Sequence, residues 1–168
     1  FLDNEVSAND RALIAIREAD AILLGPGDLY TSVIPNLLVQ EVSDAIRDTE
    51  SPVIYACNLM TKLGETAGYG ASTFASEVLR YIGGRKLDYF LVNSTKFTDD
   101  VLDVYSAEDA QPVELDYASA EEFANEILVS DLAYVDGLTV RHNSERLARI
   151  VMATVEQPVK NTLGTGLE

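Results

Sequence analysis

The stretch Asp20-Ala-Ile-Leu-Leu-Gly-Pro-Gly-Asp-Leu-Tyr-Thr-Ser32 decides the fold class of this 168-residue chain. Residues 20–24 form a short apolar run that stops at Gly25-Pro26-Gly27, a pattern that predicts a buried strand followed by a tight turn. Residues 35–47 follow with apolar side chains at helical spacing and Pro35 in the first turn, which predicts a helix. A strand, a turn and a helix in this order begin a parallel βαβ unit.

The same alternation continues along the rest of the chain. Further strands are expected at residues 52–57, 87–92, 112–115 and 127–132, and helices or helical turns at residues 8–19, 72–82, 99–108, 119–124 and 143–155. Short strands that alternate with amphipathic helices indicate a parallel sheet covered on both faces. The predicted fold class is therefore α/β with a mostly parallel sheet.

The composition excludes several classes of protein. The chain has 12 Lys and Arg residues against 28 Asp and Glu residues, a formal net charge of −16. Such acidity repels phosphate backbones and anionic lipid surfaces, so we expect no nucleic-acid partner and no membrane partner. The single Cys57 and the single His142 exclude an intramolecular disulfide and a Cys/His zinc site, and we expect no metal site. Since the chain has no bilayer-length apolar run and no signal peptide, we expect a cytoplasmic protein.

The first candidate site is the loop over residues 25–32, between the first strand and the helix that follows it. Ligands of open α/β sheets bind beyond the carboxyl ends of the strands. Gly25 and Gly27 allow backbone amides to approach a ligand closely, and Thr31 and Ser32 offer donors suited to a phosphate. The loop is neither a P-loop nor a dinucleotide fingerprint, and a purely structural tight turn explains it equally well.

A second candidate site is the loop over residues 58–66, which follows the next strand. Asn58, Thr61, Glu65 and Thr66 donate and accept hydrogen bonds, a set suited to a sugar or a base edge. The structural alternative is that Asn and Thr cap helices and that the glutamate is a surface charge. Because the two loops follow neighbouring strands, we expect them to open onto the same edge of the sheet, which favours a binding site.

A third candidate site is the segment 136–143, expected to be a loop before the last helix. The guanidinium of Arg141 matches the geometry of phosphate oxygens, and its alternative partner is a nearby carboxylate. His142 is expected to be a hydrogen-bonded structural residue, since no Ser or Cys nucleophile accompanies it.

Two further features have structural and functional interpretations. Tyr105, near the end of the helix expected at 99–108, either stacks on a base or fills the core. The acidic pairs at residues 99–100 and 121–122 are expected at solvated helix N-termini and not in metal sites.

Three motifs in this order resemble the YvcK-like gluconeogenesis factor family, which is related to 2-phospho-L-lactate transferase. The motifs are Ala19-Asp-Ala-Ile-Leu-Leu-Gly-Pro-Gly-Asp-Leu-Tyr-Thr-Ser-Val-Ile-Pro-Asn-Leu-Leu38, then Asn58-Leu-Met-Thr61 with Gly64-Glu-Thr66, then Arg141-His-Asn143. The resemblance covers residues 9–155 and implies a three-layer Rossmann-like fold. The family's glycine-rich first turn and its Asp-Asp-Gly-Gly segment have no counterpart here, so we expect an incomplete domain. Residues 1–158 would be its C-terminal part and residues 159–168 a loose tail.

The resemblance also implies a function. It implies a regulator that binds the nucleotide sugar UDP-N-acetylglucosamine and acts in carbon partitioning, cell-wall synthesis and cell shape. The ligand-binding residues it implies are Gly25, Gly27, Thr31, Ser32 and Asn36 in a phosphate-facing loop, Asn58, Thr61 and Glu65 in the second loop, and Tyr105 and Arg141 beside them. The alternative is a transferase that joins a phospho-group from a nucleotide diphosphate donor to a deazaflavin hydroxyl with Mg²⁺. Asn-Leu-Met-Thr with Gly-Glu-Thr favours the regulator, for which we assign no catalytic residue and no cofactor.

The chain departs from the family's pattern in ways that affect these expectations. Asp28 stands where the family usually has Ser, which places a carboxylate close to the expected phosphate, and Asn143 stands where Asp is usual. The carboxylate also leaves open a third possibility, a structural module with a decayed site. A half-sheet exposes an edge and apolar faces, so we expect a homo-oligomer or an N-terminal half that completes the domain.

Overall fold

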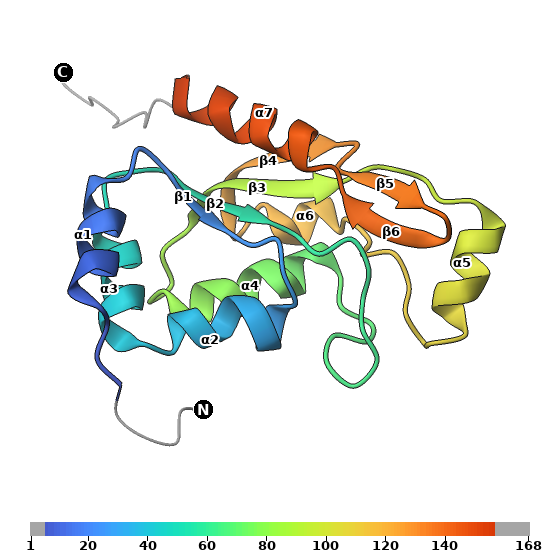
Figure 1. Ribbon diagram of the computed structural model, residues 1–168, viewed down its shortest axis with the longest axis horizontal. Coiled ribbons are helices and arrows are strands. Elements are labelled where there is room, and N and C mark those ends of the chain that lie inside the picture. Colours follow the sequence, from blue (N-terminus) through green and yellow to red (C-terminus); the bar gives the residue numbers. More distant parts are fainter. Residues whose placement is uncertain (1–5, 157–168) are drawn as a thin grey trace.

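The computed structural model describes residues 6–156 and contains a four-stranded parallel sheet in the order β1-β2-β3-β4 and a two-stranded antiparallel ribbon, β5-β6 (Figure 1). The strands are β1 (Ile22–Leu24), β2 (Val53–Ala56), β3 (Leu87–Asn93), β4 (Ala124–Ser130), β5 (Ala133–Asp136) and β6 (Thr139–His142). The α/β class and the parallel sheet are confirmed.

Helices cover both faces of this sheet. They are α1 (Asp10–Glu18), α2 (Ile34–Leu37), α3 (Gln40–Asp48), α4 (Ala71–Tyr81), α5 (Asp99–Ser106), α6 (Tyr117–Ala120) and α7 (Ser144–Glu156), and a π-helical turn, η1 (Leu29–Val33), precedes α2. Right-handed crossovers between strands that follow each other in order all lie on one face. Accordingly α2, α3, α4 and α6 cover one face and α7 crosses the other, which gives the three layers (Figure 1).

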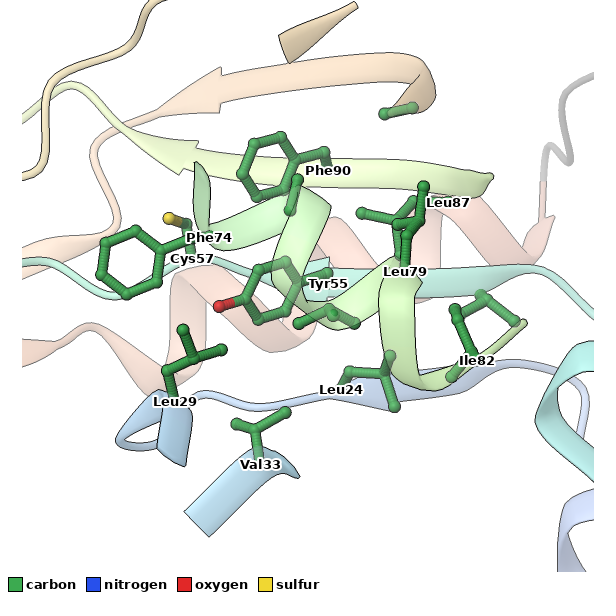
Figure 2. Close-up of a cluster of buried hydrophobic side chains, with 14 of the residues drawn as sticks. Leu24, Leu29, Val33, Tyr55, Cys57, Phe74, Leu79, Ile82, Leu87 and Phe90 are labelled. Atoms are coloured by element: carbon green, nitrogen blue, oxygen red, sulfur yellow. The ribbon is translucent and has the colours of Figure 1, made fainter. Parts of the chain in front are cut away.

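Because side chains point alternately to the two faces of the sheet along each strand, the buried side chains form two clusters, one on each face. Val53 and Tyr55 of β2 point into the larger cluster, beside Phe90 of β3 and Phe74 of α4, as Figure 2 shows for the aromatic rings. Ile54 and its neighbours on the opposite face pack against α7 in the smaller cluster. Both sides of β2 are therefore buried, which is why the strand is an uninterrupted apolar run in the sequence.

The structure corrects two of the sequence predictions in the first half of the fold. The helix expected at 35–47 is two helices, because the chain is extended at Val39, whose carbonyl begins α3 by accepting from the amides of Val42 and Ser43. The strand expected at 112–115 is absent from the sheet and forms only an isolated bridge at Pro112, a residue without the amide hydrogen that a strand interior needs.

Two more corrections concern the C-terminal half. The helical turn expected at 119–124 lies earlier, at α6, so the acidic pair 121–122 follows this helix instead of starting it. The segment 136–143 is not a loop, because most of it belongs to the β5-β6 hairpin. The tail expected at 159–168 lies outside the described residues.

Strands β1 and β4 are the two edges of the sheet within residues 6–156, and β1 pairs with β2 alone. Its central side chain, Leu23, is 39% exposed, on a strand that is otherwise part of the core.

Within residues 6–156, no helix combines the length and the apolar character that a membrane span requires.

Arg85 joins the end of α3 to the sheet. Its guanidinium donates to the carbonyls of Ile46 at 2.9 Å, Thr49 at 2.7 Å and Ser51 at 3.1 Å. It also pairs with Asp88 Oδ2 at 3.1 Å, and that oxygen accepts from the backbone of β2. One mostly buried cation therefore satisfies carbonyls that the helix end leaves unpaired.

Replacing Arg85 with Met is expected to lower the free energy of unfolding by about 1 to 2 kcal/mol, because these carbonyls lose a charged donor. The measurement is urea denaturation followed by circular dichroism. Arg80→Met is the matched control, since the side chain of Arg80 is 72% exposed. Equal effects of the two substitutions would contradict this role for Arg85.

Candidate functional site

The loop 25–33 packs its backbone directly against the end of β2. Gly25 has φ +78°, and a Cβ atom there would lie 3.1 Å from the carbonyl oxygen of Ala56. At Gly27 a Cβ atom would lie 3.1 Å from Cβ of Ser32. The tight turn that the sequence predicts is therefore present, and the positive φ of Gly25 favours glycine at that position.

Four of the predicted phosphate-loop residues line one groove, of about 280 Å³, beside β1: Gly25, Gly27, Ser32 and Asn36. The amide of Asn36 donates to the carbonyl of Ser32 at 2.6 Å, which holds η1 against α2. The groove is at the lower limit of ligand-pocket volumes, which start near about 300 Å³. A larger ligand would need further surface to enclose it.

A charged bridge joins the two candidate loops. Lys62 Nζ lies 2.7 Å from Asp28 Oδ2 in the first loop and 2.8 Å from Glu65 Oε1 in the second. The hydroxyl of Thr31 donates to the same Asp28 oxygen at 3.4 Å. The hydrogen bonds with Asp28 and then Glu65 raise the pKa of Lys62 above its ordinary value. The carboxylate of Asp28 is thus paired with a lysine of the chain itself.

A second set of hydrogen bonds joins the first loop to Tyr69 and to α4. The hydroxyl of Tyr30 lies 3.0 Å from that of Tyr69 and donates to Glu77 Oε2 of α4 at 3.1 Å. Burial, and then these hydrogen bonds, raise the pKa of Tyr30. The ion pair between Lys62 and Asp28 confirms the prediction that the two loops lie at the same edge of the sheet.

Two predicted residues of the second loop lie inside the protein. Thr61 is buried, and its hydroxyl accepts from the amide of Gln111 at 3.0 Å while its own amide donates to the Gln111 carbonyl at 2.7 Å. Asn58 Oδ1 is buried and has no hydrogen-bond partner within residues 6–156. Thr61 therefore holds the segment before α6, whereas Asn58 keeps an unused acceptor at the carboxyl end of β2.

The β5-β6 hairpin carries the third candidate segment to the same edge. His142 Nε2 donates to the carbonyl of Cys57 at 3.2 Å, directly before the second loop, which confirms its predicted structural role. Tyr105 accepts from the amide of Val140 at 2.9 Å and so fastens α5 to the hairpin. Arg141 is exposed, with Nε 3.8 Å from Asp136 Oδ2. An exposed pair at this distance stabilises little, and it leaves the guanidinium accessible to an anion.

Protonation of His142 is expected to make the free energy of unfolding depend on pH. Burial lowers its pKa below the ordinary value of 6.5, and the hydrogen bond to Cys57 only partly opposes this. Below about pH 6.5 the unfolded chain binds a proton that the folded chain resists, so stability is lost as the pH falls through this range toward the lowered pKa.

Replacing His142 with Gln, which keeps a donor for Cys57, is therefore expected to flatten the acid side of the stability profile. The measurement is the free energy of unfolding from urea denaturation at pH 7.5 and pH 5.5, chosen as about one unit on either side of the unperturbed value. An unchanged difference between the two pH values would show that other groups set the profile.

Sequence reasoning missed the roles of Lys62 and Glu77. The signal for the first was present: a lysine and an aspartate stand in loops that follow neighbouring strands. Within residues 6–156 no three His, Cys, Asp or Glu side chains are grouped to hold a metal ion. The carboxylates of Asp28, in the first loop, and Glu65, in the second loop, both contact Lys62. This donor set does not fit a Mg²⁺ ion held by the protein alone.

The fold is that of an α/β protein with a parallel sheet, and two of its candidate loops lie together at the carboxyl ends of the strands. The chain matches the family described as 2-phospho-L-lactate transferase CofD over residues 1–133, and it therefore belongs to the CofD family. Among its relatives are proteins named gluconeogenesis factor. That of Listeria monocytogenes is 36% identical over 143 residues, 84% of this chain and 43% of the relative. That of Bacillus subtilis is 32% identical over 142 residues, 84% of this chain and 45% of the relative.

Solved structures agree with this assignment. The crystal structure of protein BH3568 from Bacillus halodurans is similar to this chain with a TM-score of 0.86 and 33% identity, over 89% of this chain and 48% of that one. The Rossmann-like fold and the resemblance to gluconeogenesis factors are thereby confirmed. The chain spans about half the length of these proteins.

Proposed function

We propose that this chain forms part of a regulator that binds UDP-N-acetylglucosamine and acts in carbon partitioning, cell-wall synthesis and cell shape, in the cytoplasm. The observation that carries the proposal is that three segments meet at the carboxyl ends of the parallel strands. They are the glycine loop, the loop after β2 and the β5-β6 hairpin. Relatives named gluconeogenesis factor support a regulatory role.

Each segment supplies a different kind of contact in this proposal. The amides of loop 25–33 face the diphosphate, and Arg141 adds a charged fork to it. Asn58 Oδ1, a buried acceptor without a partner within residues 6–156, receives a donor from the base or the sugar. The ring of Tyr105, whose hydroxyl already holds the hairpin, offers a face for stacking.

The transferase is the second candidate, and the match to the CofD family is the observation in its favour. Such a reaction needs Mg²⁺ beside the transferred phospho-group. The carboxylates at this edge instead contact Lys62, and no third one joins them within residues 6–156. In a transferase, the remaining ligands of Mg²⁺ would therefore come from a part of the domain other than residues 6–156.

The site needs a partner surface to enclose a nucleotide sugar. The groove beside β1 has a volume of only about 280 Å³, and the edge of β1 is unpaired within residues 6–156. Strands added along this edge would continue the sheet and cover Leu23. In this proposal an N-terminal half, or a second copy of the chain, supplies that surface.

A thermal-shift panel tests the proposal. It uses the complete protein, meaning this chain with whatever sequence precedes or follows it in its gene. UDP-N-acetylglucosamine at about 100 times its dissociation constant is expected to stabilise the folded state by about 2.7 kcal/mol. A shift with GDP and Mg²⁺ but with no UDP-sugar would favour the transferase. No shift with any of them would contradict both candidates.

A further inference from the structure

We infer that Lys62 is a phosphate-binding cation of this site and that Asp28 competes with the ligand for it. The inference rests on the proposed nucleotide-sugar function and identifies a residue pair that sets its affinity. Lys62 comes from the loop after β2 and Asp28 from the glycine loop after β1, so the pair spans the gap between the two loops.

The ammonium group of Lys62 has one donor left for a ligand. A lysine ammonium carries three donors, and the carboxylates of Asp28 and Glu65 engage two of them, at 2.7 Å and 2.8 Å. The side chains of Lys62 and Asp28 are 51% and 45% exposed. A pair open to solvent is weakly held and exchanges partners readily, so an incoming phosphate can reach the ammonium without unfolding the loops.

The charges of the cluster oppose an anionic ligand until Asp28 is displaced. Two carboxylates and one ammonium leave one net negative charge beside the phosphate-facing loop. A diphosphate adds more negative charge at the same place, and like charges brought together weaken binding. With Asp28 neutral, the charges of Lys62 and Glu65 would cancel. The donor of the ammonium group that Asp28 engages would then be available to the ligand.

The role of Asp28 in the fold resides in its backbone. Its carbonyl accepts from the amides of Ser32 at 2.9 Å and Val33 at 3.0 Å, which starts η1. Among residues 6–156, the carboxylate contacts Lys62 and Thr31. Asp28→Asn removes the charge, keeps the shape of the side chain and leaves the backbone contacts in place.

The experiment measures the affinity of the complete protein for UDP-N-acetylglucosamine by isothermal titration calorimetry. Lys62→Met is expected to weaken binding about tenfold, and Asp28→Asn to tighten it about threefold or more, in line with the contributions of charged groups at binding surfaces. Lys86→Met and Asp48→Asn are the matched controls, because they make the same charge changes away from both loops and should leave the affinity within about twofold. Lys62→Arg, which keeps the charge, is expected to retain most of the affinity.

The outcomes separate the two claims. Binding by the wild-type protein that neither substitution alters would overturn the role of the pair and leave the proposed function standing. Weaker binding in Asp28→Asn would overturn the competition, since it would mean that the carboxylate assists the ligand. If neither the wild-type protein nor Asp28→Asn binds any UDP-sugar, both claims fail. Circular dichroism of each variant verifies its fold, and the Asp28 variant decides the question should Lys62→Met not fold.

Discussion

Replacing Phe90 with alanine is expected to lower the free energy of unfolding by about 3 to 5 kcal/mol. Phe90 is fully buried in β3 and stacks on Tyr55 of β2, with ring centroids 5.5 Å apart and an angle of 9° between the planes. Figure 2 shows both rings among the side chains of the larger cluster. The substitution loses the burial of the ring and leaves a cavity that the hydrogen-bonded sheet cannot close.

Urea denaturation of the wild-type protein and the variant measures this effect. Tyr117→Ala is the control, because it removes an aromatic ring that is 48% exposed and should change the free energy by about 0.5 kcal/mol or less. A loss for Phe90→Ala no greater than that for Tyr117→Ala would mean that this face of the sheet is not packed as described.

Replacing Arg141 with alanine is expected to weaken the binding of UDP-N-acetylglucosamine by about 1.5 to 3 kcal/mol, the range for hydrogen bonds to charged groups. That corresponds to roughly 10- to 150-fold in the dissociation constant. Stability should change little, because the side chain is exposed and its pair with Asp136 is long, at 3.8 Å. Calorimetric titration of the complete protein gives the affinity.

Arg149→Ala is the matched control for Arg141→Ala. It removes the same charge from a side chain of α7 that is 76% exposed and pairs with Glu145. An affinity of Arg141→Ala equal to that of Arg149→Ala would return Arg141 to the alternative that the sequence left open, a salt bridge with a carboxylate.

The strands of the sheet could be predicted because their burial is visible in the sequence. β2 and β3 lie between two layers of helices, so almost all their residues are apolar and stand out as runs. The residues of β5 and β6 are mostly exposed, and each strand has only four residues. A signal was available at Gly137, which has φ +63° at the first position of the two-residue turn between them.

The location of the candidate site was predictable, but its internal contacts were not. The carboxyl ends of parallel strands always meet at one edge, so the loops after β1 and β2 had to be neighbours. Which side chains cross between them depends on loop conformation and reach. The bridge from Lys62 to Asp28 and the orientation of Thr61 into the protein both follow from such local geometry. No periodicity in the sequence encodes it.

A calorimetric titration of the complete protein with UDP-N-acetylglucosamine tests the proposed nucleotide-sugar site directly. Saturable binding at one site per chain is expected, weakened by Arg141→Ala and unaffected by Arg149→Ala. Absence of binding at millimolar ligand, with a protein whose cooperative unfolding shows that it is folded, would contradict the central claim that this edge of the sheet is a nucleotide-sugar site.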